Sequence, residues 1–227
     1  MIDLKKLLNE LVIPYKKIEL YQTALTHSSY GNENNVENNE RLEFLGDAVI
    51  ELLMSDYLYT NSDLPEGTMT KKRAQAVREE ALVIYSNKID LKSYLLLGRG
   101  EEIKGANDAM IADSLEALFA ATYLDLGLNE AKRLFDRIIV PSLEESFNIR
   151  DFKSILQEII HGGGKRNISY QIIKESGPSH DKEFEAVVIL DKDIILGNGY
   201  GKTKKEAEQK AAEEALKKGN YDFKNTL

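Results

Sequence analysis

The 227-residue sequence contains no cysteine and no tryptophan. Without cysteine the chain can form neither a disulfide framework nor a thiolate metal site, which excludes a secreted disulfide-rich scaffold. No apolar run approaches the ~18 residues of a membrane span, and the N-terminus lacks the apolar stretch of a signal peptide. We therefore expect no contact with a membrane and a cytoplasmic location.

Histidine is also scarce, which limits the chemistry that the chain can support. The three histidines, His27, His161 and His180, do not lie at helical metal-ligand spacing, and no Gly-x-Ser-x-Gly motif is present. The Gly163-Gly164-Lys165 stretch follows a predicted helix and has no serine or threonine after the lysine, so we interpret it as a helix terminator rather than a phosphate loop.

Acidic side chains outnumber basic ones, and the formal net charge of −8 argues, taken alone, against a nucleic-acid partner. The excess is confined to one part of the chain. Residues 1–150 hold 25 acidic and 17 basic side chains, whereas residues 151–220 hold 12 of each. An acidic part that gathers cations and a balanced part that presents one basic face would fit this distribution, but so would two unrelated domains.

Residues 1–147 are predicted to form an all-α domain. Apolar residues recur at spacings of three and four, the period of a buried helix face, near residues 42–53 and 111–119. Other features of this domain are predicted in chain order: a polar loop at 31–35, a turn at Leu64–Thr68 before a helix that starts near Met69, and a last helical segment at roughly 141–147.

The pattern changes near residue 150, and residues 151–220 are predicted to form a small α+β domain with the order α-β-β-β-α. Asp151 can cap a helix that ends near His161. The β-rich runs that follow are Ile168–Glu175, Phe184–Leu190 and Ile194–Tyr200. The last helix runs from its N-cap Thr203 to about Lys218. Residues 148–150 form the predicted linker, which we expect to act as a hinge.

Four acidic residues are predicted to share one narrow face of a helix in the first domain. At 100° per residue, the other three fall within about 80° of Glu43, while the apolar residues of the segment fall near the opposite side. These acids are Glu40, Glu43, Asp47 and Glu51. Acids stacked on acids repel one another unless a cation offsets their charge.

A second acidic pair, Asp113 and Glu116, has i,i+3 spacing among small residues that would let another helix or a hydrated metal come close. Two helices with two carboxylates each can form an all-oxygen site, which suits Mg²⁺ or Mn²⁺. The spacing is also compatible with a solvated helix face or with the acid/base couple of a glycosidase. By itself it does not decide among these readings.

The segment Asn39–Val49, with the sequence NERLEFLGDAV, closely resembles the signature of the ribonuclease III family. Further matches to that family are Ala24–Tyr30, Leu97–Glu101, Ala112–Ala117 and Tyr123–Gly127. The second domain resembles a double-stranded RNA-binding domain at Gly177–His180 and Thr203–Gln209. Together these resemblances cover nearly the whole chain, in the domain order of the bacterial enzymes.

The resemblance implies a Mg²⁺-dependent endoribonuclease, with Mn²⁺ able to replace Mg²⁺, that forms a homodimer through its nuclease domain and cuts both strands of double-stranded RNA. The products would carry 5′-phosphate and 3′-hydroxyl ends with short 3′ overhangs, and the substrates would include ribosomal-RNA precursors and messenger RNA. Glu40 and Glu66 would lie beside the scissile phosphate. Metal binding and catalysis fall to Glu43, Asp47, Asp113 and Glu116.

The same resemblance implies four RNA contacts in the second domain. Lys204 and Lys205, in the first turn of the last helix, would meet phosphates across the major groove, where the helix amides also favour anions. His180 and Gln157 would contact the minor groove. Glu208 departs from the family pattern, in which a basic residue is common at this position, and the acid would weaken phosphate binding.

Two other functions are compatible with parts of the sequence. A non-catalytic double-stranded RNA-binding protein, dimerised through the helical domain, would be marked by loss of one or more of the four metal-binding acids, and all four are present. A helical metal enzyme that acts on another phosphate ester would leave the second domain incidental. Tight RNA binding in Mg²⁺ without cleavage would favour the first of these alternatives.

Overall fold

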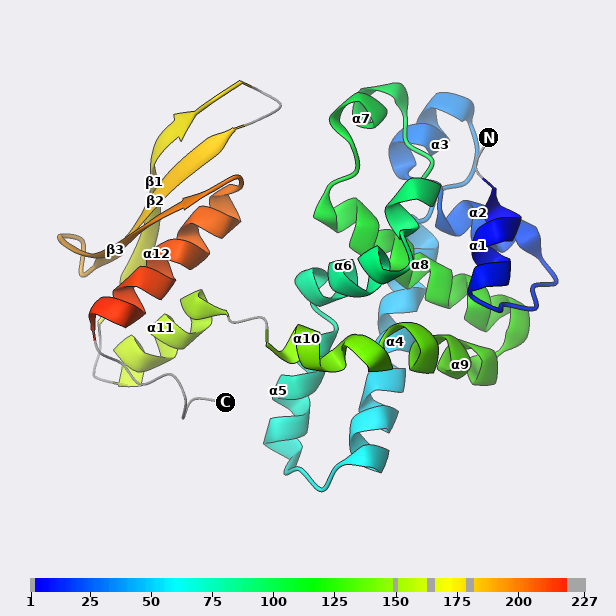
Figure 1. The fold of residues 1–227 in the computed structure, drawn as a ribbon, viewed down its shortest axis with the longest axis horizontal. Helices are drawn as coiled ribbons and strands as arrows, with labels where there is room; N and C mark the ends of the chain where they lie inside the picture. The colour runs from blue at the N-terminus through cyan, green and yellow to red at the C-terminus, as the bar shows by residue number, and fades with distance from the viewer. Residues whose placement is uncertain (1–2, 149–150, 163–165, 179–181, 220–227) are drawn as a thin grey trace. The chain divides into compact units, whose positions relative to one another are not determined.

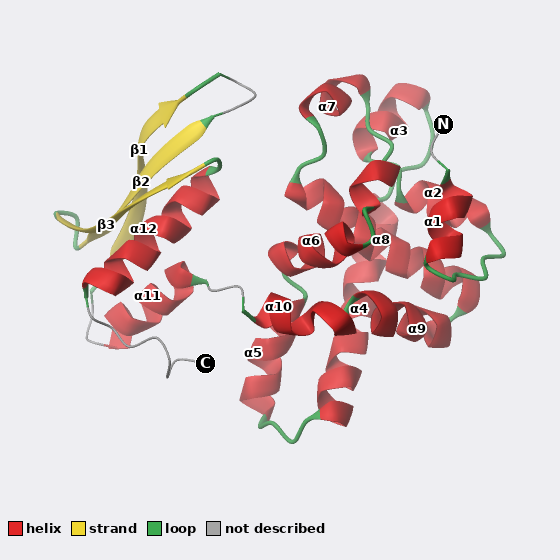
Figure 2. Ribbon diagram, in the orientation of Figure 1, coloured by secondary structure: helices red, strands yellow, loops and turns green. Residues whose placement is uncertain are grey.

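The computed structural model of the protein describes residues 3–148, 151–162, 166–178 and 182–219. The chain divides into two compact units, residues 1–149 and 150–227, each with a hydrophobic core of its own. Figure 2 shows helices in the first unit and a sheet with helices in the second. The predicted fold class, an all-α domain followed by a small α+β domain, is confirmed.

The first unit is helical throughout the residues that are described. Its elements are α1 (Leu4–Glu10), α2 (Ile18–Ala24), α3 (Ser28–Asn34), α4 (Glu40–Asn61), α5 (Glu66–Ala76), α6 (Glu79–Lys88), η1 (Leu91–Tyr94), α7 (Arg99–Lys104), α8 (Asp108–Leu126), α9 (Leu128–Ile138), η2 (Val140–Ser142) and α10 (Leu143–Phe147). The two longest helices, α4 and α8, pack against each other inside the unit (Figure 1). Helix α8 suits this position because most of its side chains are apolar or small, and they are buried along most of its length.

Gly46 lets α4 approach α8 more closely than any other residue would. A Cβ atom added to Gly46 would lie 1.9 Å from the backbone carbonyl oxygen of Glu116. That oxygen belongs to the α8 backbone and cannot move aside like the end of a flexible side chain. The contact therefore sets the register between the acid-bearing turns of the two helices.

Two predicted boundaries in the first unit are wrong. Gly31–Asn34, predicted to be part of a polar loop, is the second half of α3, which ends where Asn35 takes a left-handed conformation with φ 52°. The buried side of this helix is provided by a glycine, so no apolar period marks it in the sequence. Helix α5 begins at Glu66 rather than near Met69, because an acid in the first turn of a helix is favoured by the helix dipole.

The second unit has the predicted order of elements: α11 (Phe152–Gly162), β1 (Ile168–Ser176), β2 (Glu183–Leu190), β3 (Ile194–Gly201) and α12 (Lys204–Lys218). The strands form an antiparallel sheet in the order β1-β2-β3. Glycines on β3 let α12 lie directly on the sheet, since a Cβ atom at Gly199 would be 2.1 Å from the carbonyl oxygen of Ala207.

The two helices in the described part of the second unit are capped as predicted. The Asp151 carboxylate accepts a hydrogen bond from the Ser154 amide at 3.1 Å. The Thr203 hydroxyl oxygen accepts one from the Glu206 amide, also at 3.1 Å, and the Glu206 carboxylate accepts one from the Lys202 amide. These caps satisfy amides that would otherwise lack partners.

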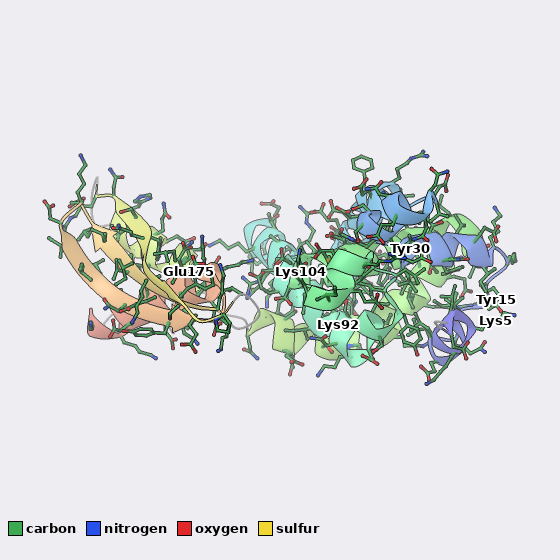
Figure 3. All side chains as sticks on the ribbon, turned by 90° about the horizontal axis from the view of Figure 1, so that it is seen from above. Lys5, Tyr15, Tyr30, Lys92, Lys104 and Glu175 are labelled. Carbon is green, nitrogen blue, oxygen red and sulfur yellow. The ribbon has the colours of Figure 1, made fainter. Side chains whose placement is uncertain are left out.

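Charged side chains lie on the surfaces of both units. Figure 3 labels Lys92 and Lys104 on the first unit and Glu175 on the second. Glu175 forms an ion pair with Lys182, across the β1–β2 hairpin. Each helix in the described part of the chain is too short or too polar to cross a lipid bilayer.

Candidate functional site

Three of the predicted acids come together where α4 and α8 pack against each other. Glu43 on α4, and Asp113 and Glu116 on α8, each place a carboxylate oxygen within 4.8 Å of those of the other two. All three side chains are half-buried. These three residues form the acid cluster. Over the described residues, no other group of histidine and acidic side chains meets in this way.

Burial and nearby negative charges raise the pKa of every member of the acid cluster; for Asp113 the nearby charge is that of Glu79. For Glu116, desolvation by burial and then the charges of Asp47, Asp113 and Glu43 raise the pKa to about 8. Desolvation is likewise the main cause of the raised pKa of Glu43 and of Asp113. No lysine or arginine in the described residues forms an ion pair with any of the three.

The acid cluster fits a hard divalent cation. Its donors are all carboxylate oxygens, which Mg²⁺ and Mn²⁺ prefer over softer ligands. A cation held among them would offset the repulsion that raises their pKa values. The structure therefore provides a set of ligands that could hold a metal ion, although the oxygens alone do not select one hard cation over another.

The other predicted acids lie outside the acid cluster. Asp47 is exposed, one turn after Glu43 on α4, and close enough to raise the pKa of Glu116. Glu40 is exposed in the first turn of α4 and contributes to the raised pKa of Glu43. The exposed Glu51 of the predicted acidic face takes no part in the cluster.

Glu66 is not brought to the acid cluster of its own chain. It lies at the start of α5, beyond the C-terminal end of α4, where its carboxylate accepts a hydrogen bond from the Thr70 hydroxyl at 3.0 Å. The stretch of α4 from Glu43 to Asn61 is about 27 Å long at 1.5 Å per residue. Helix α4 therefore separates Glu66 from the cluster.

Two buried polar residues that the sequence did not single out link the helices of the acid cluster. Asn39, 2% exposed, precedes α4, and Ser114, fully buried, follows Asp113 on α8. The Asn39 side-chain amide donates to the Ser114 hydroxyl oxygen at 3.4 Å, and the Asn39 backbone amide donates to the Thr26 carbonyl at 2.9 Å. Asn39 has the residue type of a helix cap, but its partner on α8 has no signal in the sequence.

The predicted RNA contacts of the second unit are partly described. Lys204 and Lys205 are exposed in the first turn of α12, and Gln157 is exposed on α11. His180 lies outside the described residues. Glu208, expected to weaken phosphate binding, is only partly exposed and forms an ion pair with Lys153 of α11.

The chain matches two family models: Ribonuclease-III-like over residues 17–143, and double-stranded RNA binding motif over residues 152–218. It is 53% identical over 221 residues to Ribonuclease 3 of Onion yellows phytoplasma, with 96% of this chain and 92% of the relative covered. It is 46% identical to Ribonuclease 3 of Staphylococcus haemolyticus, with 94% and 90% covered.

A solved structure agrees with these matches. The nuclease domain of ribonuclease III from Campylobacter jejuni is 34% identical and superposes with a TM-score of 0.57, covering 61% of this chain and 97% of that domain. The helical unit and the motif that follows it define a ribonuclease with a double-stranded RNA binding motif. The chain belongs to the ribonuclease III family.

Proposed function

We propose that the protein is an endoribonuclease that hydrolyses phosphodiester bonds of double-stranded RNA with Mg²⁺, which Mn²⁺ can replace. The acid cluster is the observation that carries this proposal, because its half-buried carboxylates come from two helices and are not offset by an ion pair within the described residues. Glu43, Asp113 and Glu116 would hold the ion, with Asp47 beside them.

In this proposal the side chains of the acid cluster act mainly by holding the metal ion in place. When bound, the ion supplies Lewis-acid stabilisation of the negative charge that develops on the phosphate during hydrolysis. The close packing at Gly46 keeps the carboxylates of α4 and α8 in register before substrate arrives, so little reorganisation is needed during the reaction. Glu40 is proposed to lie beside the scissile phosphate. The proposed products have 5′-phosphate and 3′-hydroxyl ends and short 3′ overhangs.

The second unit would bind the RNA duplex through its shape and its phosphates, because the major groove of A-form RNA is too deep and narrow for side chains to read. Lys204 and Lys205 stand where the amides of the α12 N-terminus add to the attraction for phosphate. Gln157 and His180 are the proposed minor-groove contacts. The proposed domains are residues 1–147 and 151–220.

A homodimer through the nuclease unit is part of the proposal. Within one chain α4 separates Glu66 from the acid cluster, so the proposed role of Glu66 requires a second copy to present it. A symmetric pair would let each copy do this for the other. Phe44 and Leu52, 84% and 54% exposed on α4, are large apolar side chains of the kind that such an interface would cover.

The substrates and the location are proposed from the family resemblance. Ribosomal-RNA precursors and structured messenger RNA are the expected substrates, and the cytoplasm is the expected compartment. Of the linker expected at 148–150, residues 149 and 150 lie outside the described residues.

An end-labelled RNA hairpin with a perfect stem tests the proposed activity. The protein is incubated with it in Mg²⁺, in Ca²⁺ and in EDTA, beside the variants Glu116→Gln and Glu51→Gln. We expect discrete cuts on both strands with short 3′ overhangs only in Mg²⁺, loss of these cuts in Glu116→Gln, and normal cutting by Glu51→Gln, which removes an acid of the same helix face outside the acid cluster.

Two results would contradict the proposal. Full cleavage by Glu116→Gln would refute the assignment of the acid cluster. Binding of the hairpin without cleavage in all three conditions would identify the protein instead as a non-catalytic double-stranded RNA-binding dimer, the alternative that the sequence left open.

A further inference from the structure

Lys153 and Glu208 join the two helices of the second unit. The Lys153 ammonium on α11 lies 2.6 Å from a carboxylate oxygen of Glu208 on α12. The two side chains are 32% and 23% exposed, so the pair is partly shielded but still open to solvent. The same ammonium lies 4.5 Å from the ring centroid of Tyr170 on β1. Three elements of the unit therefore hold one cation in place.

The backbone next to this ion pair is also tied to α12. The Lys153 amide donates to the side-chain oxygen of Gln209 at 3.3 Å, and the side-chain nitrogen of Gln209 donates to the Asp151 carboxylate at 2.9 Å. The first turn of α11 is thus fixed against α12 beside the lysine. A cation ordered in this way loses less conformational freedom on binding a ligand than a free surface lysine does.

The position of the ion pair connects the predicted RNA contacts of the two helices. Glu208 follows Lys204 by four residues and Lys205 by three, so all three lie on one face of α12. Lys153 precedes Gln157 by four residues, so these two share a face of α11. The ion pair therefore joins the face of α12 that carries the predicted phosphate contacts to the face of α11 that carries the predicted minor-groove contact.

We propose that Lys153 is a phosphate contact of the RNA-binding surface and that the charge of Glu208 moderates its attraction for phosphate. This inference rests on the proposed function. A lysine ammonium has three N–H donors, and the bond to Glu208 uses one, which leaves donors for a phosphate oxygen. Glu208, expected from the sequence to weaken phosphate binding, would do so by offsetting the charge of this cation on α11.

Opposite effects of two substitutions in the same ion pair test the proposal. Binding of the full chain to an RNA duplex of more than ~16 base pairs is measured in EDTA over a range of KCl concentrations. Lys153→Met should weaken binding about fivefold and reduce the slope of log K against log[KCl] by about one. Glu208→Gln breaks the same pair but leaves the cation, so it should strengthen binding by a similar factor. Lys153→Arg should keep wild-type binding.

Lys217→Met is the matched control, because Lys217 is paired at 2.7 Å with Glu213 near the far end of α12 and the change removes the same charge from the same unit. We expect it to leave the salt slope unchanged. The proposal is overturned if Lys153→Met binds like Lys217→Met, or if Glu208→Gln also weakens binding, as a purely structural brace would require. If either of these results is found while the wild type still cuts the hairpin in Mg²⁺, only the role proposed for Lys153 is refuted. A wild type that neither binds nor cuts RNA would refute the proposed function as well.

Discussion

The carboxylate of Glu116 has a different proton affinity in the folded chain than it has in water. Burial and the charges of Asp47, Asp113 and Glu43 raise its pKa from 4.5 to about 8. A folded-state pKa above the unfolded value means that the stability contributed by the protonated group is fully present below about pH 4.5 and is lost as the pH rises through about 8. In the metal-free protein Glu116 therefore opposes folding at neutral pH, where it must take up a proton, and at alkaline pH, where its charge is partly buried.

Glu116→Gln keeps this side chain neutral at every pH. In EDTA at pH 9 we expect the variant to be more stable than the wild type by about 1 kcal/mol, discounted for solvent screening, which corresponds to a melting temperature roughly 2–4 °C higher. At pH 5 the difference in melting temperature between the variant and the wild type should nearly vanish. Added Mg²⁺ should raise the melting temperature of the wild type more than that of the variant. Thermal melts at both pH values measure this difference. An equal difference at pH 5 and at pH 9 would contradict the prediction.

Asp47 should contribute to metal affinity more than to the maximal rate. It is exposed and stands beside the acid cluster rather than within it. For Asp47→Asn we expect the Mg²⁺ concentration at half-maximal cleavage to rise by about tenfold or more, with much of the activity recovered at high Mg²⁺. Titrations of the cleavage rate with Mg²⁺ distinguish this variant from Glu116→Gln, which high Mg²⁺ should not rescue. Identical titration curves for the two would show that Asp47 belongs to the cluster.

At the scale of elements, the packing of α4 against α8 decides whether the acid cluster forms. Gly46→Ala would place a Cβ atom 1.9 Å from the Glu116 carbonyl oxygen, so the helices would have to separate. We expect a loss of stability of about 3 kcal/mol or more, at the upper end of overpacking effects, and loss of cleavage even below the lowered melting temperature. Urea unfolding and hairpin cleavage measure the two effects.

A second glycine in the same unit provides the control for this substitution. Gly67 lies in α5, and a Cβ atom there would meet nothing within 4 Å. Alanine is also favoured over glycine inside a helix by up to about 1 kcal/mol, so Gly67→Ala should be neutral or slightly stabilising. If Gly46→Ala were tolerated equally well, the close contact between α4 and α8 would not determine the site.

The same contact explains how much of the site could be predicted from the sequence. The 3.6-residue period of one helix is enough to place Glu43 and Asp47 on a common face of α4, and i,i+3 spacing is enough to pair Asp113 with Glu116. The meeting of Glu43 with the α8 acids depends on how two helices cross, which no local pattern encodes. The buried Asn39–Ser114 contact was missed for the same reason.

The fold was predictable where a segment carries its own period or cap. The three strands and α12, with its Thr203 cap, were located to within a residue or so. Helix α3 was missed because its buried side is provided by Gly31 rather than by a periodic apolar residue. The start of α5 was placed too late because Pro65-Glu66-Gly67 has the composition of a turn, although proline and an acid also suit the beginning of a helix.

Across the whole molecule, the two units differ in charge in a way that matches the roles proposed for them. The acidic residues that give the first 150 residues their excess include the acid cluster, whereas residues 151–220 are neutral overall and place Lys204 and Lys205 together at the start of α12. The proposed surface has few phosphate contacts, so we expect a modest affinity that falls further as salt screens the charges. Two copies acting on one duplex would strengthen binding, because the second contact becomes intramolecular.

The proposed homodimer makes a prediction about which chain supplies Glu66. Homodimers of Glu66→Gln and of Glu116→Gln should each be impaired in both sites. In a mixed dimer of the two variants, the site with an intact acid cluster receives Glu66 from the other chain, where it is unchanged, so one complete site is restored. If Glu66 instead acted within its own chain, no site of the mixed dimer would be complete.

Co-purified mixed dimers, selected through two different affinity tags, allow this comparison on a hairpin labelled at either end. We expect the mixed dimer to nick one strand faster than either parent homodimer, at up to half the wild-type rate because one site of two is restored, with few double-strand cuts. Activity no higher than that of the parents would place Glu66 with the acid cluster of its own chain, or outside the reaction. Because α4 separates Glu66 from the acid cluster within one chain, this measurement tests directly whether the complete site is shared between two copies.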